Sequence, residues 1–306
     1  MSDLTVAGEV LPVPAGAPIS LSDEDLAALR RAVGVLEKPT LATRLSNAAG
    51  APLDMIGRSL PAPVTDVVAR SAEGAMRAAL RVALATLPDK DVAPAASDLE
   101  TVAERTGNRL SRLFQSADSR HKAMAVLSGA VGGAFGLATL AVELPVSTTL
   151  MLRSIAEIAR EEGEDLSDPE NALACVQVFA LGGRGGTDTA LSESGYFAVR
   201  AALAKTMAEA AKYAAHRSVL DSSAPALIRF ASQIAARFGI VVSQKVAAQA
   251  VPVLGAFGGA AVNTAFMNHF QAMARAHFTV RRLERVYGAE PVREAYTLEK
   301  EALGIA

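Results

Sequence analysis

Apolar residues recur every three or four positions along most of the chain, and this spacing is typical of one face of an α-helix. No stretch alternates apolar and polar residues over more than a few positions, as a half-buried strand would. The pattern therefore predicts an all-α fold. We expect helices over residues 22–37, 40–60, 64–87, 98–116, 119–142, 146–162, 169–181, 195–217, 223–249, 252–288 and 291–302.

Local signals set the boundaries of these predicted helices. Ser22 followed by Asp25 is a variant of the capping box, in which the serine side chain accepts a hydrogen bond from the third helical position. Pro145 is expected to begin a new helix, because proline suits the first turn of a helix and not its interior. The run from Ser167 to Glu170 is interpreted as a second capping box. Gly239 is expected to break its helix into two pieces.

Two segments rich in glycine and alanine stand out among the predicted helices. The first includes Gly129, Gly133 and Gly136, and the second includes Gly255 and Gly259, so both contain G-x-x-x-G spacings. Residues four apart share a face of a helix, and small residues there let another backbone come close. We expect two central helices that pack through these glycines, in the manner of a glycine zipper.

The same segments leave two alternatives open. Residues 123–142 carry no charge, and this run is as long as the roughly 20 residues that a membrane-spanning helix needs. Residues 246–270 have no formal charge apart from His269, although they include polar amides such as Asn263. The helices could therefore span a membrane, or belong to a soluble protein that docks on lipid and partly inserts.

Composition limits the classes of function. The 306-residue chain has a net charge of −2, which gives no reason to expect nucleic-acid binding. Its single cysteine, Cys175, excludes an intrachain disulfide and a cysteine-based zinc site. Residues 1–20 contain three prolines and no basic residue, so we interpret them as a mobile tail without a secretory signal. Residues 21–306 are expected to form a single domain.

The last long helix carries polar residues on an otherwise apolar face. Asn263 and His277 fall on one heptad-spaced row, and Arg281 adjoins it. If these residues face inward they need partners, since an unpaired buried polar group costs about 1–3 kcal/mol. Glu143 interrupts the first glycine-rich region and is the natural candidate. The pattern predicts a constellation of these four residues at a helix-lined cavity, where it would bind a head group, hold a metal weakly or exchange protons.

A structural interpretation of the same residues also stays open. Glu143 would then stabilise a helix start, Asn263 would be a satisfied core amide, and His277 and Arg281 would be ordinary structural residues. The four histidines include no pair spaced to chelate one ion, so no metal is expected. The glycine loop at 182–186 lacks the lysine of a phosphate-binding Walker motif, and no cofactor is expected.

Several segments, in this order and spacing, resemble the EcsC protein family of bacteria. They are the glycine-rich run 129–136 leading into Glu143-Leu144-Pro145, LRSIA at 152–156, VFALGG at 178–183, ESGYF at 193–197, GGAAVN at 258–263, and then His277, Arg281 and Glu284. The resemblance covers roughly residues 60–290. It implies a helical, cytoplasmic or membrane-associated protein and no established reaction. These segments add Arg153 and Tyr196 to the ligand-binding candidates.

Three classes of function remain. The leading hypothesis is a non-enzymatic protein that binds lipid, a membrane or a membrane-protein partner through its glycine-rich helices. A partner related to an ABC transporter is implied by the family, which is named after a protein encoded beside such an operon. The alternatives are a hydrolase of an apolar or lipid-like substrate, with Glu143 and His277 as acid–base pair, and an oligomeric scaffold. We expect a cytoplasmic location, peripheral at the inner membrane.

Overall fold

The structure is a computed structural model that describes residues 21–37, 41, 60–85, 132–182, 195–216, 224–250 and 259–305. Within these ranges the regular elements are all α-helices, which confirms the predicted fold class. They are α1 (Asp23–Glu37), α4 (Ala62–Ala85), α7 (Gly132–Glu161), α8 (Pro169–Leu181), α10 (Tyr196–His216), α11 (Pro225–Ala250), α13 (Gly259–Tyr287) and α14 (Ala289–Ala302).

Helix α8 lies at the centre and contacts α4, α7, α10, α11 and α13. All its residues from Ala172 to Leu181 are buried, because the helix is apolar around its whole circumference. Its Phe179 packs against Phe238 of α11 and Phe270 of α13, with ring centroids 5.3 and 5.2 Å apart. These aromatic contacts join three helices that are distant in sequence.

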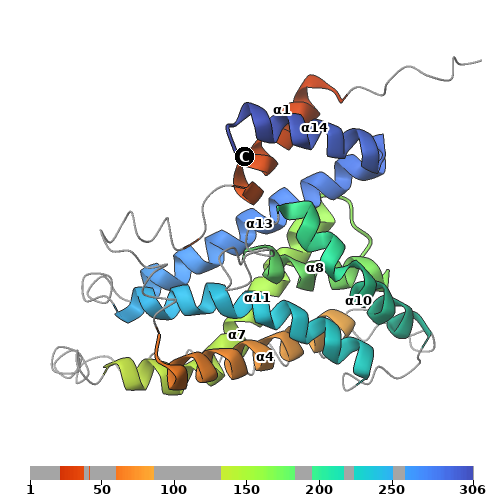
Figure 1. The fold of residues 1–306 in the computed structure, drawn as a ribbon. Coiled ribbons are helices and arrows are strands. Elements are labelled where there is room, and N and C mark those ends of the chain that lie inside the picture. The colour runs from red at the N-terminus through yellow and green to blue at the C-terminus, as the bar shows by residue number, and fades with distance from the viewer. Residues whose placement is uncertain are drawn as a thin grey trace, which may run out of the picture.

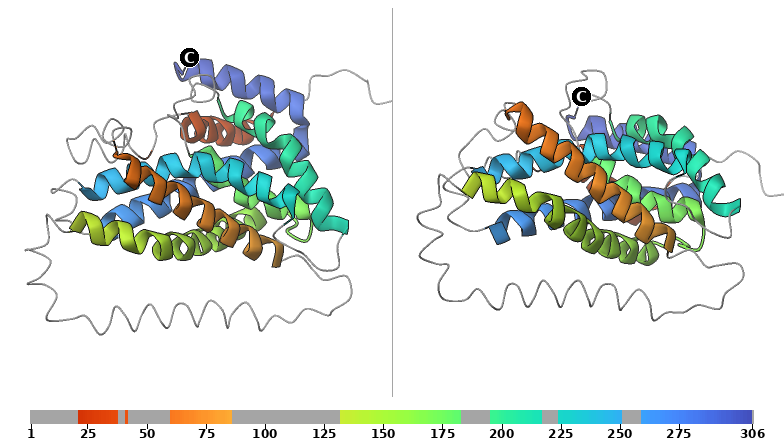
Figure 2. Two further views of the ribbon diagram at one scale, coloured as in Figure 1. Left: turned by 60° about the horizontal axis from the view of Figure 1, so that its bottom comes forward. Right: turned by 90° about the horizontal axis from the view of Figure 1, so that it is seen from below.

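The other helices lie on two sides of this centre. Helices α4, α7 and α11 form one side, which we call the α4–α7–α11 layer, while α1 and α14 lie at the opposite end with α13 passing between (Figures 1 and 2). Helix α4 packs on both α7 and α11, and α1 packs on α13 and α14. The buried face of α4 is rich in alanine, so its neighbours approach closely.

Helices α7 and α13 run parallel to each other. Gln271 donates a hydrogen bond to Ser154 at 2.8 Å, and Thr279, two turns further along α13, donates one to Glu162 at 3.1 Å. Because both residue numbers increase together, the contact follows the two helices in the same direction. This pairing fixes which parts of α7 and α13 can share a site.

Pro145 does not begin a helix, contrary to the sequence prediction. It lies inside α7, which is continuous from Gly132 to Glu161. A proline in a helix removes one backbone hydrogen bond, here to the carbonyl of Ala141, and Ala141 is exposed to water. The hydroxyls of Ser147 and Thr149 donate to backbone carbonyls beside the proline. The helix therefore continues because the lost bond falls where water can replace it.

Gly239 does not break its helix either, since α11 is continuous from Pro225 to Ala250. A glycine inside a helix costs about 1 kcal/mol, and packing outweighs that cost. A Cβ at Gly239 would contact the Ala72 side chain of α4 at 3.9 Å, so the position lies close to the neighbouring helix.

The first cap signal is confirmed, and the second differs in detail. The Asp25 backbone donates to the Ser22 hydroxyl at 3.1 Å. At α8 the cap is Asp168, whose carboxylate accepts from the Glu170 backbone at 2.8 Å. Ser167 instead donates to Asp165. The predictions for residues 1–20, 40–60, 98–116 and 119–131, and for Gly129 and Gly255, lie outside the described residues except for single positions.

Candidate functional site

Tyr196, at the start of α10, and His277, in α13, meet in the interior of the bundle. The Tyr196 hydroxyl lies 2.9 Å from Nδ1 of His277, and both side chains are buried. The Arg200 guanidinium lies 3.3 Å from the same hydroxyl. Because arginine only donates, the Tyr196 oxygen accepts from Arg200 and its own hydrogen is donated to Nδ1. This direction of the hydrogen bond requires an unprotonated Nδ1, as in the neutral ring that carries its proton on Nε2.

The surroundings of His277 keep its ring neutral. Burial lowers the pKa of His277 well below its usual value, and the charges of Arg200 and Arg281 lower it further. Burial raises the pKa of the Tyr196 hydroxyl. The buried Nε2 atom of His277 has no hydrogen-bond partner among the described residues. Neither ring titrates near neutral pH, so the pair suits a structural hydrogen bond better than proton exchange.

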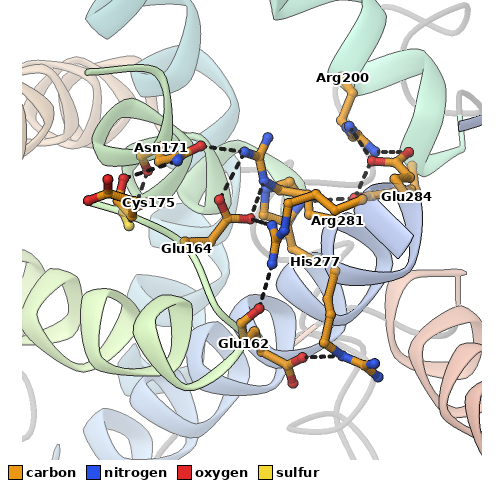
Figure 3. Close-up of polar contacts among 12 residues, drawn as sticks. Glu162, Glu164, Asn171, Cys175, Arg200, His277, Arg281 and Glu284 are labelled. Carbon is orange, nitrogen blue, oxygen red and sulfur yellow. Dashed lines mark hydrogen bonds and ion pairs between the residues drawn. The ribbon is translucent and has the colours of Figure 1, made fainter. Parts of the chain in front are cut away.

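Arg281 lies one turn beyond His277 and is paired with a carboxylate and an amide. Its guanidinium donates to both carboxylate oxygens of Glu164, at 2.7 and 3.2 Å, and to the Asn171 side chain at 2.7 Å. Arg285 also donates to Glu164 and, at 2.5 Å, to the Glu162 carbonyl. Burial alone would raise the pKa of Glu164, but the two arginines outweigh it and the pKa lies below its usual value. Figure 3 shows these contacts.

The outer part of the same region is an ion pair between helices. Arg200 of α10 donates to both oxygens of Glu284 in α13, at 2.8 and 2.9 Å (Figure 3). Nearby, burial raises the pKa of the Cys175 thiol to about 12, so this thiol is not a nucleophile at neutral pH. We call this set of side chains the His277 cluster: Glu164, Asn171, Tyr196, Arg200, His277, Arg281, Glu284 and Arg285. Each of its two carboxylates is paired with at least one of its three arginines, and the cluster joins α10 and α13 to α8 and the end of α7.

Glu143 lies elsewhere and has a partner that the sequence did not suggest. Its carboxylate lies 2.7 Å from Nζ of Lys245 in α11. The lysine side chain is 0% exposed, whereas that of Glu143 is 34% exposed. The ammonium also lies 5.0 Å from the centroid of the Phe266 ring in α13. One buried cation thus contacts side chains of α7 and α13 together.

The expectation that Glu143 partners His277 is wrong. Glu143 lies 11 residues before Ser154, and His277 lies 6 residues after its partner Gln271. At about 1.5 Å per residue, the parallel helices hold Glu143 and His277 roughly 25 Å apart. The acid–base pair suggested for a hydrolase is therefore absent from the described residues. Tyr196 and Arg281, by contrast, do lie beside His277.

The remaining predicted residues fall on the surface or near the start of helices. Asn263 is exposed on the first turns of α13, so the prediction that it faces inward is wrong. Arg153 is exposed on α7. Gly133 and Gly136 lie in the first turns of α7, and Gly259 is the first residue of α13.

Two buried charged residues with specific partners, Lys245 and Glu37, were not predicted from the sequence. Lys245 is a lone charge within an apolar helical run, and that isolation was a usable signal. Glu37 is buried at the end of α1, where its carboxylate accepts from the Tyr196 backbone at 3.0 Å and from the Tyr296 hydroxyl at 2.8 Å. A carboxylate at the start of α10 is favoured by the helix dipole. Nothing local to the sequence around Glu37 indicates that role.

Apolar side chains remain exposed on the outer face of α7. Val142 is 68% exposed and Leu150 is 52% exposed, with the half-buried Val146 midway between them. Positions 142, 146 and 150 share one face of a helix, and Arg153 follows on the same face. We call Val142, Val146 and Leu150 the α7 stripe.

Two further features bear on a membrane span and on a metal site. In the described part of the chain, the segment Pro225–Gln249 of α11 is long and apolar enough to cross a membrane by length and composition alone. Its mean hydropathy is 1.3, and 44% of the most apolar window is buried in the fold. The described residues contain no group of three His, Cys, Asp or Glu side chains placed to hold a metal ion.

Comparison with known proteins gives a family and nothing closer. The model of the EcsC protein family matches residues 23–283 of the chain. Neither the curated proteins nor the solved structures compared with the chain gave a match.

Proposed function

The chain belongs to the EcsC protein family, and we propose that it is a non-enzymatic protein that docks on lipid membranes through the outer face of its α4–α7–α11 layer. The observation that carries this proposal is the α7 stripe. Exposed aliphatic side chains grouped on one face of a helix are typical of an interaction surface. Membrane docking is favoured over the hydrolase suggested above because Glu143 and His277 lie roughly 25 Å apart, too far to act as its acid–base pair.

Charge on the same layer supports a lipid partner. Arg70, Arg77 and Arg81 are exposed on α4, on the side opposite the buried alanines. Arg153 continues the α7 stripe at its C-terminal end. Arginines beside an apolar face let the aliphatic groups enter the acyl region while the guanidinium groups stay at head-group level. Each basic residue near an anionic membrane contributes about 1 kcal/mol.

Vesicle co-sedimentation tests the proposal. The protein is mixed with vesicles of phosphatidylcholine alone and with vesicles that also contain phosphatidylglycerol. We expect binding to the anionic vesicles, and we expect the double variant Val142→Glu, Leu150→Glu to bind at least about tenfold more weakly. Burying each aliphatic side chain contributes about 1.5–3 kcal/mol, and about 1.4 kcal/mol is a tenfold change.

The chain offers a matched control on the other side of the molecule. Val286 and Leu298 are 62% and 66% exposed, at the end of α13 and on α14. The double variant Val286→Glu, Leu298→Glu makes the same chemical change there and should bind vesicles like the unmodified protein. Equal binding by both double variants, or no vesicle binding by the unmodified protein, would refute membrane docking through α7.

A further inference from the structure

A groove runs along the surface between α4 and α11, separate from the His277 cluster. It holds about 400 Å³, within the 300–1,000 Å³ typical of small-molecule sites. Its apolar lining is Val68 and Ala69 from α4 and Ala235, Ala236, Gly239 and Ile240 from α11. Most of these side chains are small, so the two helices leave a shallow channel between them.

The ends of the groove are polar. Helices α4 and α11 run in opposite directions (Figures 1 and 2), so the start of α4 lies beside the end of α11. Thr65 and Ser243 therefore line one end of the groove, and Glu73 and Ser232 line the other. Among the described residues that line the groove only Glu73 is charged, so an amphiphile with one extended chain can place its head group at the Glu73 end and its chain along the apolar middle.

The length of the groove fits one acyl chain. Thr65 and Glu73 are eight residues apart on α4, and Ser232 and Ser243 are eleven apart on α11. At about 1.5 Å per residue, these spans are roughly 12 and 16 Å. One leaflet provides about half of the roughly 30 Å hydrocarbon core of a bilayer, so one acyl chain reaches about 15 Å.

Opposite charges lie together at the Glu73 end. Arg77 donates to Glu73 at 2.6 Å, and the two side chains are partly exposed, 53% and 40%. A head group with a phosphate and a protonated amine offers complementary charges to both, the phosphate to Arg77 and the ammonium to Glu73. A head group with a phosphate alone would draw Arg77 away from Glu73 and leave that carboxylate without a counter-charge.

We propose that this groove binds the acyl chain of a zwitterionic phospholipid, with the head group at Glu73 and Arg77. The inference deepens the proposed function and rests on it, because the same layer of helices would face the membrane. The occupant is one chain of a lipid that carries a protonated amine.

Titration with lysophosphatidylethanolamine below its micelle concentration tests the site. Calorimetry and native mass spectrometry should show one bound lipid. Gly239→Leu should weaken binding at least about tenfold by filling the channel. Gly34→Leu makes the same change on α1, at the opposite end of the molecule, where a Cβ meets nothing within 4 Å, and this matched control should leave binding unchanged. Ser243→Leu, which blocks the other end, replaces Gly239→Leu if that variant does not fold.

Each part of the proposal has a result that overturns it. No binding by the unmodified protein, or unchanged binding in both leucine variants of the groove, overturns the acyl groove. Equal affinity for lysophosphatidylglycerol overturns the head-group assignment, which otherwise predicts that Glu73→Gln, Arg77→Gln removes the preference. Vesicle binding separates this site from membrane docking: Gly239→Leu should still sediment with anionic vesicles, whereas Val142→Glu, Leu150→Glu should still bind the single lipid.

Discussion

His277 shows how one residue acquires its chemistry from neighbours that are distant in sequence. The hydrogen bond from Tyr196 and the charges of Arg200 and Arg281 all favour the neutral ring. A histidine held neutral by burial is a structural acceptor in the folded protein and a base once the chain unfolds. The consequence appears in the pH dependence of stability.

Below pH 6.5 the unfolded chain protonates this histidine and the folded protein does not. The unfolded state then binds more protons, so the free energy of unfolding falls as the pH falls, by up to about 1.4 kcal/mol per pH unit. His277→Gln should make this slope shallower by about that amount. Urea unfolding at a series of pH values between neutral and mildly acidic measures it. An unchanged slope in His277→Gln would contradict the assignment.

At the scale of the element, glycines determine where a helix ends and how closely a neighbouring helix can pack. Gly163 ends α7 with φ of +81°, a conformation that other residues rarely adopt. Gly182 follows α8 with an ordinary φ of −77°, so its glycine is required by space and not by backbone conformation. A Cβ there would lie 2.6 Å from Nε2 of the buried His269.

Gly182→Ala should therefore destabilise the junction of α8 with α13. Overpacking of this kind costs about 1–3 kcal/mol. Gly74→Ala, on the exposed side of α4 where a Cβ meets nothing within 4 Å, should instead stabilise the protein by about 0.5–1 kcal/mol. Urea unfolding of the two variants compares them directly. The steric account fails if both glycines tolerate alanine equally.

At the scale of the whole molecule, two polar centres hold the bundle at opposite ends of the parallel helices α7 and α13. The His277 cluster joins the C-terminal part of α13 to α8, α10 and the end of α7. The Lys245 ammonium joins α11 to Glu143 of α7 and the Phe266 ring of α13. The α7 stripe and the groove lie on the α4–α7–α11 layer, so the proposed lipid contacts leave both centres intact.

Glu143→Gln should destabilise the whole fold by about 3 kcal/mol. The change leaves a fully buried ammonium without its counter-charge, and breaking such a pair costs about 3–5 kcal/mol. The lower value applies because Glu143 is partly exposed. The double variant Glu143→Leu, Lys245→Met should be close to the unmodified protein in stability, because removing both charges removes the desolvation cost. Urea unfolding checks both, and a Glu143→Gln protein of unchanged stability would contradict this role.

The sequence by itself determined the features that depend on neighbours along the chain. Apolar spacing predicted α1, α4, α8, α10 and α14 within a few residues, because a helix is built from local hydrogen bonds and one buried face. The apolar circumference of α8 explains in the same way why this helix is buried on all sides. The heptad row contained both His277, which is buried, and Asn263, which is exposed, so the row by itself did not decide which of them faces inward.

Tertiary structure alone decided which helices meet and in which direction. Contacts between α7 and α11 put Glu143 beside Lys245, and contacts between α10 and α13 put Tyr196 beside His277. No local pattern in the sequence contains these pairings. Tertiary structure also overrode two local signals, since Pro145 and Gly239 lie inside continuous helices. A glycine or proline inside a helix costs about 1–3 kcal/mol, and the helix breaks only where packing does not offset that cost. The packing depends on residues far away in the sequence.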